Sequence, residues 1–471
     1  MKIIAFAGKN CDINHDHREV FFMKASRFLS VLLILAVLAG SVAALAEDTR
    51  YEEVYKAYSI NSVDAQVDGR GLFRIYERNG QYGLIDETGA VLIAPQFKNR
   101  FSYVDYGYFY VQDDSGELNN QALVDAHGNI LTPYQYADFK VLDQNWVLGI
   151  KLTPTTSELY DYSGLRGTNY LIYAVDVYDF SRGTQVGSLK REQYKRAKVV
   201  AGKYLLTEDR NEKIQLYDEN LQPIESNYKS LYDDELYITK VGFEDCVVSR
   251  ITGETVAKGL SRVYGISRSE LYWVKGDNSR SNWGLMDRTG KLLTELDYDS
   301  DYSSNNGGYM VVSYYDKKGL MRLSDGQVVV PCKYDEILRN NSTSSYVSNG
   351  YAAVVVNGKV GFVDLNGNVT CEPKYAKAAV TVLGCTMYAT DLDGTYIVIA
   401  ADGTVTRDIA AIREYNCSAD GYFLSAQNAD GLWGVIDWHG ESVIPYINKD
   451  YFSVRHNNYV IYNETLYRLA R

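Results

Sequence analysis

The sequence predicts an all-β fold of tandem antiparallel β-repeats of about 38 residues, arranged like the blades of one or two β-propellers. Three observations predict it. A phrase that ends in Asp, two residues and Gly returns along the chain, and its closing Gly recurs about every 36 to 41 residues. Short runs of strand-forming residues alternate with Gly-containing turns. No segment after residue 47 shows a sustained helical period. An open β-solenoid is the alternative architecture.

The composition is that of a folded, acidic protein. Of the 471 residues, 46% are hydrophobic and 23% are charged, which is too apolar for a disordered chain. The formal net charge of −12 argues against a nucleic-acid partner, because phosphate binding requires clustered Lys and Arg. Tyrosine is unusually frequent, with 42 residues against 14 Phe and 5 Trp. Tyrosine is therefore the residue type to examine for a binding role.

The N-terminal region reads as a leader that precedes the repeats. Residues 1–22 show no apolar period, and we interpret them as an upstream extension, with translation starting at Met23. Residues 23–46 have the three parts of a secretory signal peptide. These parts are a basic start, an apolar run, and a small-x-small cleavage site at Ala44 and Ala46.

An uncleaved membrane anchor is the alternative interpretation of the same segment. Residues 28–46 are apolar or small, and this length is within the range of a membrane-spanning helix. Both interpretations place the rest of the chain outside the cytoplasmic membrane. We therefore expect an exported protein, extracellular or at the cell surface, or else one that is membrane-anchored by an N-terminal helix.

The strongest copies of the repeat share one pattern: an aromatic or apolar residue and Gly, an apolar-x-Asp strand end, two residues, and a closing Gly. These signature residues are Tyr82, Gly83, Asp86 and Gly89; Trp283, Gly284, Asp287 and Gly290; Gly361, Asp364 and Gly367; and Trp433, Gly434, Asp437 and Gly440. We expect structural roles for them. Asp at a strand end can accept hydrogen bonds from the following turn amides, and a closing Gly adopts a positive φ without steric cost.

One copy shows how each unit forms strands. Residues 351–356 are rich in Val and end at Asn357-Gly358, a two-residue hairpin signal. Residues 360–364 form the next expected strand. Residues 369–375 follow and contain a Pro, which belongs on an edge strand or at a strand end. Each unit is therefore a small antiparallel sheet.

The repeats divide the exported part into three regions. Residues 47–70 are a lead-in that can supply a closing strand, residues 71–260 are a first repeat array, and residues 261–471 are a second. Residues 51–54 match the outer part of a unit, whereas residues 459–469 resemble an inner hairpin that lacks its outer part. Because the two ends are complementary, they can pair and remove unpaired sheet edges.

These phrases resemble the WG-repeat family, also called KWG repeats, named for the Trp-Gly that stands here at Trp283-Gly284 and Trp433-Gly434. The resemblance covers roughly residues 70–446. It implies a bacterial, propeller-like β-repeat protein and brings no catalytic residues to this chain.

Candidate chemistry is sparse in the sequence. His127 and His439 occupy the same repeat position in different units, so we expect them to lie apart rather than to form a metal or catalytic site. Asp297, Asp299 and Asp301 alternate like an oxygen-rich calcium loop, but the position of the bidentate Glu is occupied by Gly. A solvated acidic turn is the simpler interpretation. We expect neither a metal site nor a cofactor.

Clustered tyrosines are the candidate binding residues. A Tyr side chain on a strand can stack on a sugar ring or anchor a protein partner at little entropic cost. The candidates are Tyr103, Tyr106, Tyr108, Tyr110, Tyr314 and Tyr315. The alternative is purely structural, because Tyr favours strands and covers half-exposed sheet surfaces.

The function expected from the sequence is non-catalytic. We predict an exported binding or scaffold module that holds a protein or glycan partner at the bacterial envelope, without nucleic acid, and with membrane contact only through residues 28–46 if these are uncleaved. The alternatives are a glycan-active hydrolase or lyase that uses a carboxylate pair, and a sensor ectodomain on the uncleaved anchor.

Overall fold

The computed structural model describes residues 50–470 except 68–69, 100, 116, 158–159, 164–168, 267–268, 278–281, 300–304, 341–344, 391–393, 419–420 and 456–457. The chain divides into two compact units, Met1–Glu52 and Glu53–Arg471, and the second contains the repeats. The upstream extension of residues 1–22 and the signal or anchor segment of residues 23–46 lie outside the described residues. In the described residues, no helix is long and apolar enough to span a membrane.

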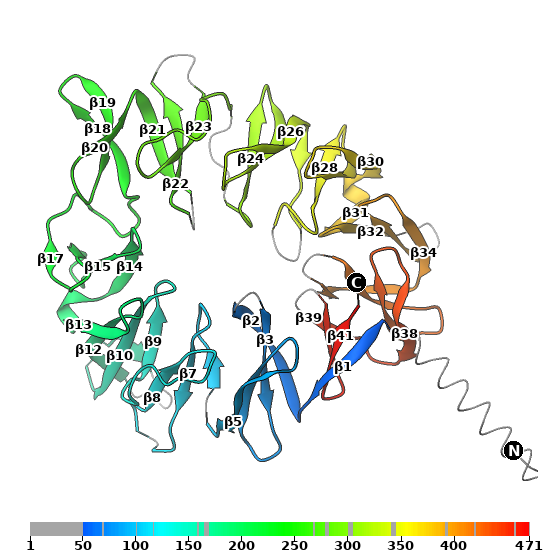
Figure 1. Ribbon diagram of the computed structural model, residues 1–471, viewed down its shortest axis with the longest axis horizontal. Coiled ribbons are helices and arrows are strands. Elements are labelled where there is room, and N and C mark those ends of the chain that lie inside the picture. Colours follow the sequence, from blue (N-terminus) through cyan, green and yellow to red (C-terminus); the bar gives the residue numbers. More distant parts are fainter. Residues whose placement is uncertain are drawn as a thin grey trace, which may run out of the picture. The chain divides into compact units, whose positions relative to one another are not determined.

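The described part of the chain forms eleven small antiparallel sheets, with two single-turn 3₁₀ helices, η2 (Arg191–Gln193) and η3 (Lys377–Ala379). Ten of these sheets are built from consecutive strands. Sheets that are adjacent in sequence also lie side by side (Figure 1). The arrangement is that of β-propeller blades, so the all-β repeat fold predicted from the sequence is confirmed.

Sheets 1 to 5 contain, in chain order, β2 (Ser59–Val67), β3 (Arg70–Tyr76), β4 (Tyr82–Asp86) and β5 (Val91–Phe97); β6 (Phe101–Tyr103), β7 (Phe109–Gln112) and β8 (Gln121–Val124); β9 (Asp138–Val141), β10 (Trp146–Thr155), β11 (Tyr162–Ser163), β12 (Asn169–Asp179) and β13 (Thr184–Lys190); β14 (Arg196–Val200), β15 (Tyr204–Glu208), β16 (Ile214–Tyr217) and β17 (Pro223–Ile224); and β18 (Leu236–Val241), β19 (Glu244–Ser249) and β20 (Thr255–Lys258).

Sheets 6 to 11 contain β21 (Leu260–Gly265), β22 (Leu271–Gly276) and β23 (Trp283–Asp287); β24 (Tyr309–Tyr314), β25 (Lys317–Arg322) and β26 (Val328–Tyr334); β27 (Glu336–Ile337), β28 (Tyr351–Val356), β29 (Lys359–Asp364) and β30 (Val369–Ala376); β31 (Val380–Leu383), β32 (Thr386–Thr390), β33 (Tyr396–Ala400) and β34 (Val405–Ile409); β35 (Ala411–Cys417), β36 (Phe423–Gln427), β37 (Trp433–Asp437) and β38 (Ser442–Asn448); and β39 (Ser453–Arg455), β40 (Tyr459–Tyr462) and β41 (Thr465–Leu469) with β1 (Tyr51–Lys56).

The hairpin turns have the geometry that the sequence signals require. Asn357 and Gly358 join β28 to β29 with φ of 50° and 73°, so both turn residues are left-handed, as a type I′ hairpin demands. At the next turn, Asp364 Oδ1 accepts the amides of Asn366 and Asn368 at 2.9 and 2.8 Å. Gly367 lies between them with a φ of 81°. This turn shows why Asp and Gly recur three residues apart.

The Gly of the Trp-Gly pair has a different cause, a bulge in the strand that follows. The register of β29 with β30 shifts on both sides of Phe362, and the backbone of β30 passes close to Gly361. A Cβ added at Gly361 would lie 2.3 Å from the Cys371 carbonyl oxygen. Gly83, Gly284 and Gly434 are crowded in the same way by a carbonyl oxygen at 2.6 to 2.7 Å. The signature Gly is therefore required by a close backbone approach.

The hydrophobic core is divided into layers between neighbouring sheets. Leu84 of sheet 1 packs in one cluster with Phe101 and Phe109 of sheet 2. In the same way Trp273 of sheet 6 packs with Met310 of sheet 7. Cys246, Cys332, Cys371 and Cys385 are free and at least half-buried. Because each sheet buries its faces against its neighbours, the array is stabilised sheet by sheet, as in other repeat proteins.

The two ends of the repeat array meet in sheet 11. Here β1 pairs with β41, giving the strand order β1-β41-β40-β39. The Ala57 amide donates to the Glu464 carbonyl oxygen at 3.1 Å, and Phe73 packs edge-on against Tyr459 with ring centroids 5.5 Å apart. Of the two architectures predicted from the sequence, the structure therefore has the closed, propeller-like one. The boundary expected between residues 260 and 261 stays a prediction.

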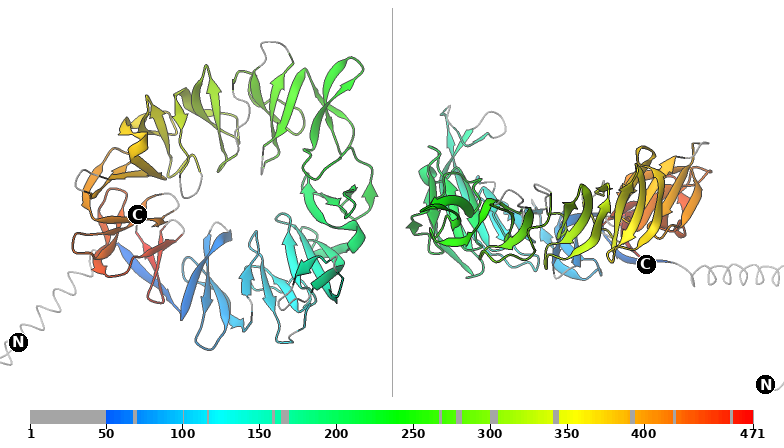
Figure 2. Two further views of the ribbon diagram at one scale, coloured as in Figure 1. Left: turned by 180° about the vertical axis from the view of Figure 1, so that it is seen from behind. Right: turned by 90° about the horizontal axis from the view of Figure 1, so that it is seen from above.

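Sheet 3 is the main departure from the repeat pattern. Its strands β10 and β12 have 10 and 11 residues, against four to seven in most other sheets. Their hairpin extends beyond the neighbouring sheets in the view from above (Figure 2). This insertion explains why the repeat phrase is weak in this part of the sequence.

Candidate ligand-binding site

The tyrosines singled out in the sequence do not form one site. Tyr103 contacts the cluster of sheets 1 and 2, and Tyr108 and Tyr110 pack against the cluster between sheets 2 and 3. Tyr108 also donates its hydroxyl to the Gln144 carbonyl oxygen at 2.8 Å. Tyr106 lies at the exposed turn between β6 and β7.

Tyr314 and Tyr315 lie at the tip of the β24–β25 hairpin, with ring centroids 4.6 Å apart. Tyr315 is 79% exposed, so its ring projects into solvent. The pair belongs to sheet 7, whereas the other four candidate tyrosines belong to sheet 2 and its turns. A role for these tyrosines in binding stays a prediction.

The acidic loop that resembles a calcium-binding sequence is described only in part. Asp297 and Asp299 are described, and their amides donate to the carbonyl oxygens of Trp283 and Ser313 at 3.1 and 2.8 Å. Asp301 lies outside the described residues. Within the residues that the structure covers, no three His, Cys, Asp or Glu side chains are grouped to hold a metal ion.

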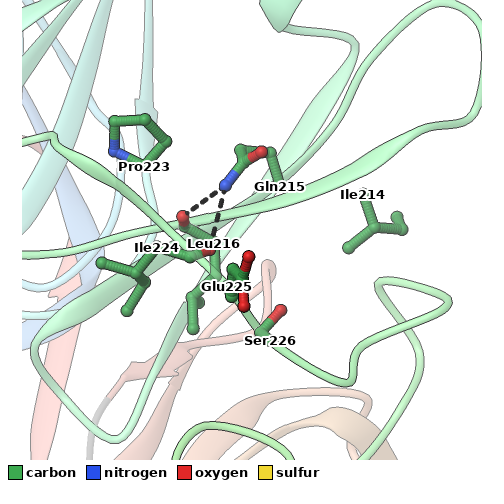
Figure 3. A pocket seen from close by; sticks show the side chains of 7 residues that line it. All are labelled: Ile214, Gln215, Leu216, Pro223, Ile224, Glu225 and Ser226. Atoms are coloured by element: carbon green, nitrogen blue, oxygen red, sulfur yellow. Dashed lines mark hydrogen bonds between the residues drawn. The ribbon is translucent and has the colours of Figure 1, made fainter.

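Surface hollows are the next candidates. One, of about 410 Å³, lies at the β16–β17 edge of sheet 4 (Figure 3). Gln215 donates there to the carbonyl oxygens of Leu216 and Ile224 at 2.8 and 3.1 Å, so its amide nitrogen is already hydrogen-bonded within the protein. Another, of about 700 Å³, lies beside Leu152 and Tyr173. Neither hollow combines several aromatic rings with charged groups.

A third hollow, of about 360 Å³, combines these features and is here called the tyrosine hollow. It lies between β18 of sheet 5 and β21 of sheet 6. Its lining residues are Tyr232, Asp233, Asp234, Leu236, Tyr237, Ile238, Arg250, Ser261, Arg262, Val263 and Tyr264. The volume is at the lower end of the range for small-molecule sites.

Tyr264 is a rigid aromatic platform on one side of the hollow. Its ring stacks on Trp283, with centroids 5.6 Å apart and planes 18° apart, and is 41% exposed. Trp283 stacks in turn on buried Trp273, at 6.4 Å and 5°. The signature Trp of this repeat therefore supports a ring that faces solvent.

Tyr232 is a second exposed ring and is also held in place. It is 79% exposed, and its hydroxyl accepts a hydrogen bond of 2.6 Å from Arg196. Arg196 is fixed by two bonds to Glu208, at 2.6 and 2.9 Å. On the backbone side, the Tyr232 amide donates to Ser230 Oγ at 3.1 Å.

Most of the charged groups of the hollow already form hydrogen bonds or ring contacts within the protein. Asp233 Oδ2 accepts the amides of Lys229 and Ser230 at 2.7 and 3.0 Å. Arg250 lies 4.2 Å from the centroid of the Tyr237 ring and donates to the carbonyl oxygens of Asp234 and Asn227 at 3.0 and 2.9 Å. These bonds pre-organise the hollow before any ligand arrives.

Two side chains of the hollow have polar atoms that remain available for hydrogen bonds to a ligand. Asp234 accepts the Gly265 amide at 2.8 Å through Oδ2, which leaves Oδ1 available. Arg262 is exposed, and its guanidinium has no partner within the described residues. Behind them, burial lowers the pKa of Lys198 although Asp234 and Asp233 oppose this shift. Lys198 donates to the Asp233 carbonyl oxygen at 2.8 Å.

Sequence reasoning missed this hollow. Its three tyrosines come from a loop and from strands of two different sheets, so no sequence cluster marks them. The one available signal was Trp283, because a signature Trp at a strand start can support an exposed ring of the same sheet.

The fold and this hollow define a class of protein: a repeat protein of the β-propeller type with a preformed aromatic surface hollow. A family model described as WG containing repeat matches residues 82–115, 283–317 and 324–359. The chain therefore contains WG repeats at these three positions.

Comparison with other proteins adds little beyond this. No curated protein sequence matches the chain. The solved structures that resemble it include a eukaryotic initiation factor, with 12% identity over 86% of this chain and 99% of that one and a TM-score of 0.32. BamB from Moraxella catarrhalis has 12% identity over 58% of this chain and 93% of its own, with a TM-score of 0.19. At TM-scores this low, the likenesses support no inference about function.

Proposed function

We propose that this chain is a non-catalytic, exported binding module that holds a glycan of the bacterial envelope in the tyrosine hollow. The observation that carries the proposal is the pair of held, solvent-facing rings, Tyr232 and Tyr264, beside charged groups that the fold already fixes. Flat exposed rings bind the apolar faces of sugar rings, and a pre-ordered platform loses little entropy on binding. A rigid β-repeat array suits this role because it presents the rings without rearrangement.

The ionisation of the carboxyl groups supports binding rather than catalysis. A general acid for glycoside cleavage needs a raised pKa. In the described part of the chain, each carboxyl pKa shift that is resolved is downward, as for Asp86, Asp161 and Asp176. Hydrogen bonds and nearby cations outweigh burial at these three groups and keep them ionised.

Export rests on the sequence of the leader. A basic start, an apolar run and a small-x-small site precede Glu47. Intact-mass measurement of the chain recovered from the producing cell should give Glu47 as its first residue. A chain that starts at Met1 or Met23 would contradict cleavage and favour the anchored ectodomain.

Sedimentation with the insoluble polysaccharide fraction of the cell envelope tests the binding function. The purified wild-type chain should sediment with this fraction, and Tyr264→Ala should lose most of the bound material because the central platform is gone. Loss of one aromatic anchor typically costs 2 kcal/mol or more, which is about thirtyfold in affinity. Tyr451→Ala is the matched control, because it removes another exposed ring that packs against a signature Trp, Trp433, outside the hollow, and it should sediment like wild type. Equal sedimentation of all three chains would contradict the proposal.

A further inference from the structure

We propose that the tyrosine hollow selects an acidic saccharide, with the carboxylate of a uronic-acid unit bound by Arg262 and its ring on Tyr264. This inference rests on the proposed function and names the ligand class of the same site. It starts from the groups in the hollow that have no partner, because these are the groups that a ligand can satisfy.

The charged side chains at the hollow differ in how many hydrogen-bond and ion-pair partners they already have. Arg250 is occupied by two carbonyl oxygens and by the Tyr237 ring, and it lies 4.0 Å from Asp233. Asp233 is occupied by two amides. Lys198, close behind, offsets the remaining charge of Asp234. Among the cations at the hollow, Arg262 is then the one without a hydrogen-bond or ion-pair partner in the described residues, since Arg250 and Lys198 both donate to carbonyl oxygens.

A free guanidinium beside an aromatic platform favours a particular chemistry. Arg presents a planar fork that matches a carboxylate with two parallel hydrogen bonds. A uronic-acid unit carries a carboxylate on a sugar ring, so one unit can place its ring on Tyr264 and its carboxylate at Arg262. Oδ1 of Asp234 is available to accept a hydrogen bond from a sugar hydroxyl. A polyanion such as nucleic acid would instead meet the net charge of −12.

We expect the electrostatic contribution to ligand affinity to come from the hollow itself. The hollow is small, about 360 Å³, and so holds one or two sugar units rather than a long anionic segment. Each unit added beyond the hollow would add negative charge to a complex with a protein whose own net charge is −12. Specificity should therefore depend on one carboxylate at Arg262, and not on the total charge of the ligand.

Isothermal titration of the purified chain with tetragalacturonate and with its methyl ester tests this inference. The two probes share their rings and differ in the carboxylate charge. Wild type should bind the acid form about tenfold or more tightly than the ester, since a hydrogen bond to a charged group contributes about 1.5 to 3 kcal/mol. Arg262→Gln should remove this preference and leave the affinity for the ester unchanged. Arg413→Gln, which removes an exposed Arg outside the hollow that lies over the Tyr451 ring, should change neither.

The possible results separate the inference from the proposed function. If both probes bind equally to wild type, or if Arg262→Gln keeps the preference, the acidic-ligand inference is wrong. Loss of both affinities in Tyr264→Ala would still support glycan binding in that case. If neither probe binds, the inference is again wrong, and envelope sedimentation with the Tyr264 variant decides the function on its own. Titration of galacturonate monomer distinguishes a free sugar acid from a polymer as the ligand.

Discussion

Gly361→Ala is expected to lower the free energy of unfolding by about 3 kcal/mol or more, the upper part of the range for overpacking a tight site. The added methyl would lie 2.3 Å from the Cys371 carbonyl oxygen and 2.7 Å from the Pro373 nitrogen. Both are backbone atoms, so no side chain can rotate to relieve the contact. The bulge between β29 and β30 would have to open. Urea unfolding followed by tryptophan fluorescence measures the loss.

Gly350→Ala is the matched control for this prediction. Gly350 precedes β28 in the same sheet with a φ of 81°, and a Cβ there would meet nothing within 4 Å. Its substitution should cost only the left-handed strain of about 1 kcal/mol. A Gly361 variant no less stable than the Gly350 variant would show that the close backbone approach is not what requires the signature Gly.

Asp176→Ala is expected to destabilise the protein by about 3 to 5 kcal/mol, the usual result of removing one partner from a buried ion pair. Asp176 is buried in sheet 3, where its Oδ2 lies 2.9 Å from Lys151 Nζ and accepts the Tyr136 hydroxyl at 2.8 Å. The variant would leave the Lys151 charge and the Tyr136 hydroxyl buried without this acceptor. Asp325→Ala removes an exposed pair with Arg322 and should leave the unfolding midpoint unchanged.

The same carboxyl predicts a dependence of stability on pH. Burial raises the pKa of Asp176, but hydrogen bonds from Ser188, Lys151 and Tyr136 outweigh it, and the pKa is lowered overall. Its stabilisation should be complete above the ordinary Asp pKa of about 3.9 and be lost as the pH falls through the lower, folded-state pKa. Unfolding measured from pH 6 down to about 3 should show a smaller pH-dependent loss in Asp176→Asn than in wild type. Equal losses would contradict this role.

The fold was predictable because its signals are local. Asn357-Gly358 and the turn at Asp364 act within a few residues, and each acts in the structure as its residue types indicate. The Gly at position 361 could be recognised as a signature but not explained, because its cause is a bulge in the following strand. The closure by β1 was indicated by the complementary ends of the chain and is present in sheet 11.

The candidate site was not predictable in the same way. Neighbouring tyrosines in the sequence, such as Tyr108 and Tyr110, pack against the core because strand alternation and hairpin folding bury them. Tyr232 and Tyr264 are 32 positions apart in the sequence and line the same hollow because sheet 5, which follows the Tyr232 loop, and sheet 6, which contains β21, are adjacent. Such a site requires the packing of one repeat on the next, which a pattern within one repeat does not contain.

Hydrogen exchange of the N-terminal strand tests most directly whether a single copied sheet module closes on itself. In native buffer, followed by mass spectrometry, peptides covering β1 and Ala57 should exchange as slowly as peptides from β40 and β41, because β1 pairs with β41 and the Ala57 amide is bonded to Glu464. Rapid, unprotected exchange across β1, with the interior sheets still protected, would mean that the ends of the array do not meet and that the repeats form an open structure.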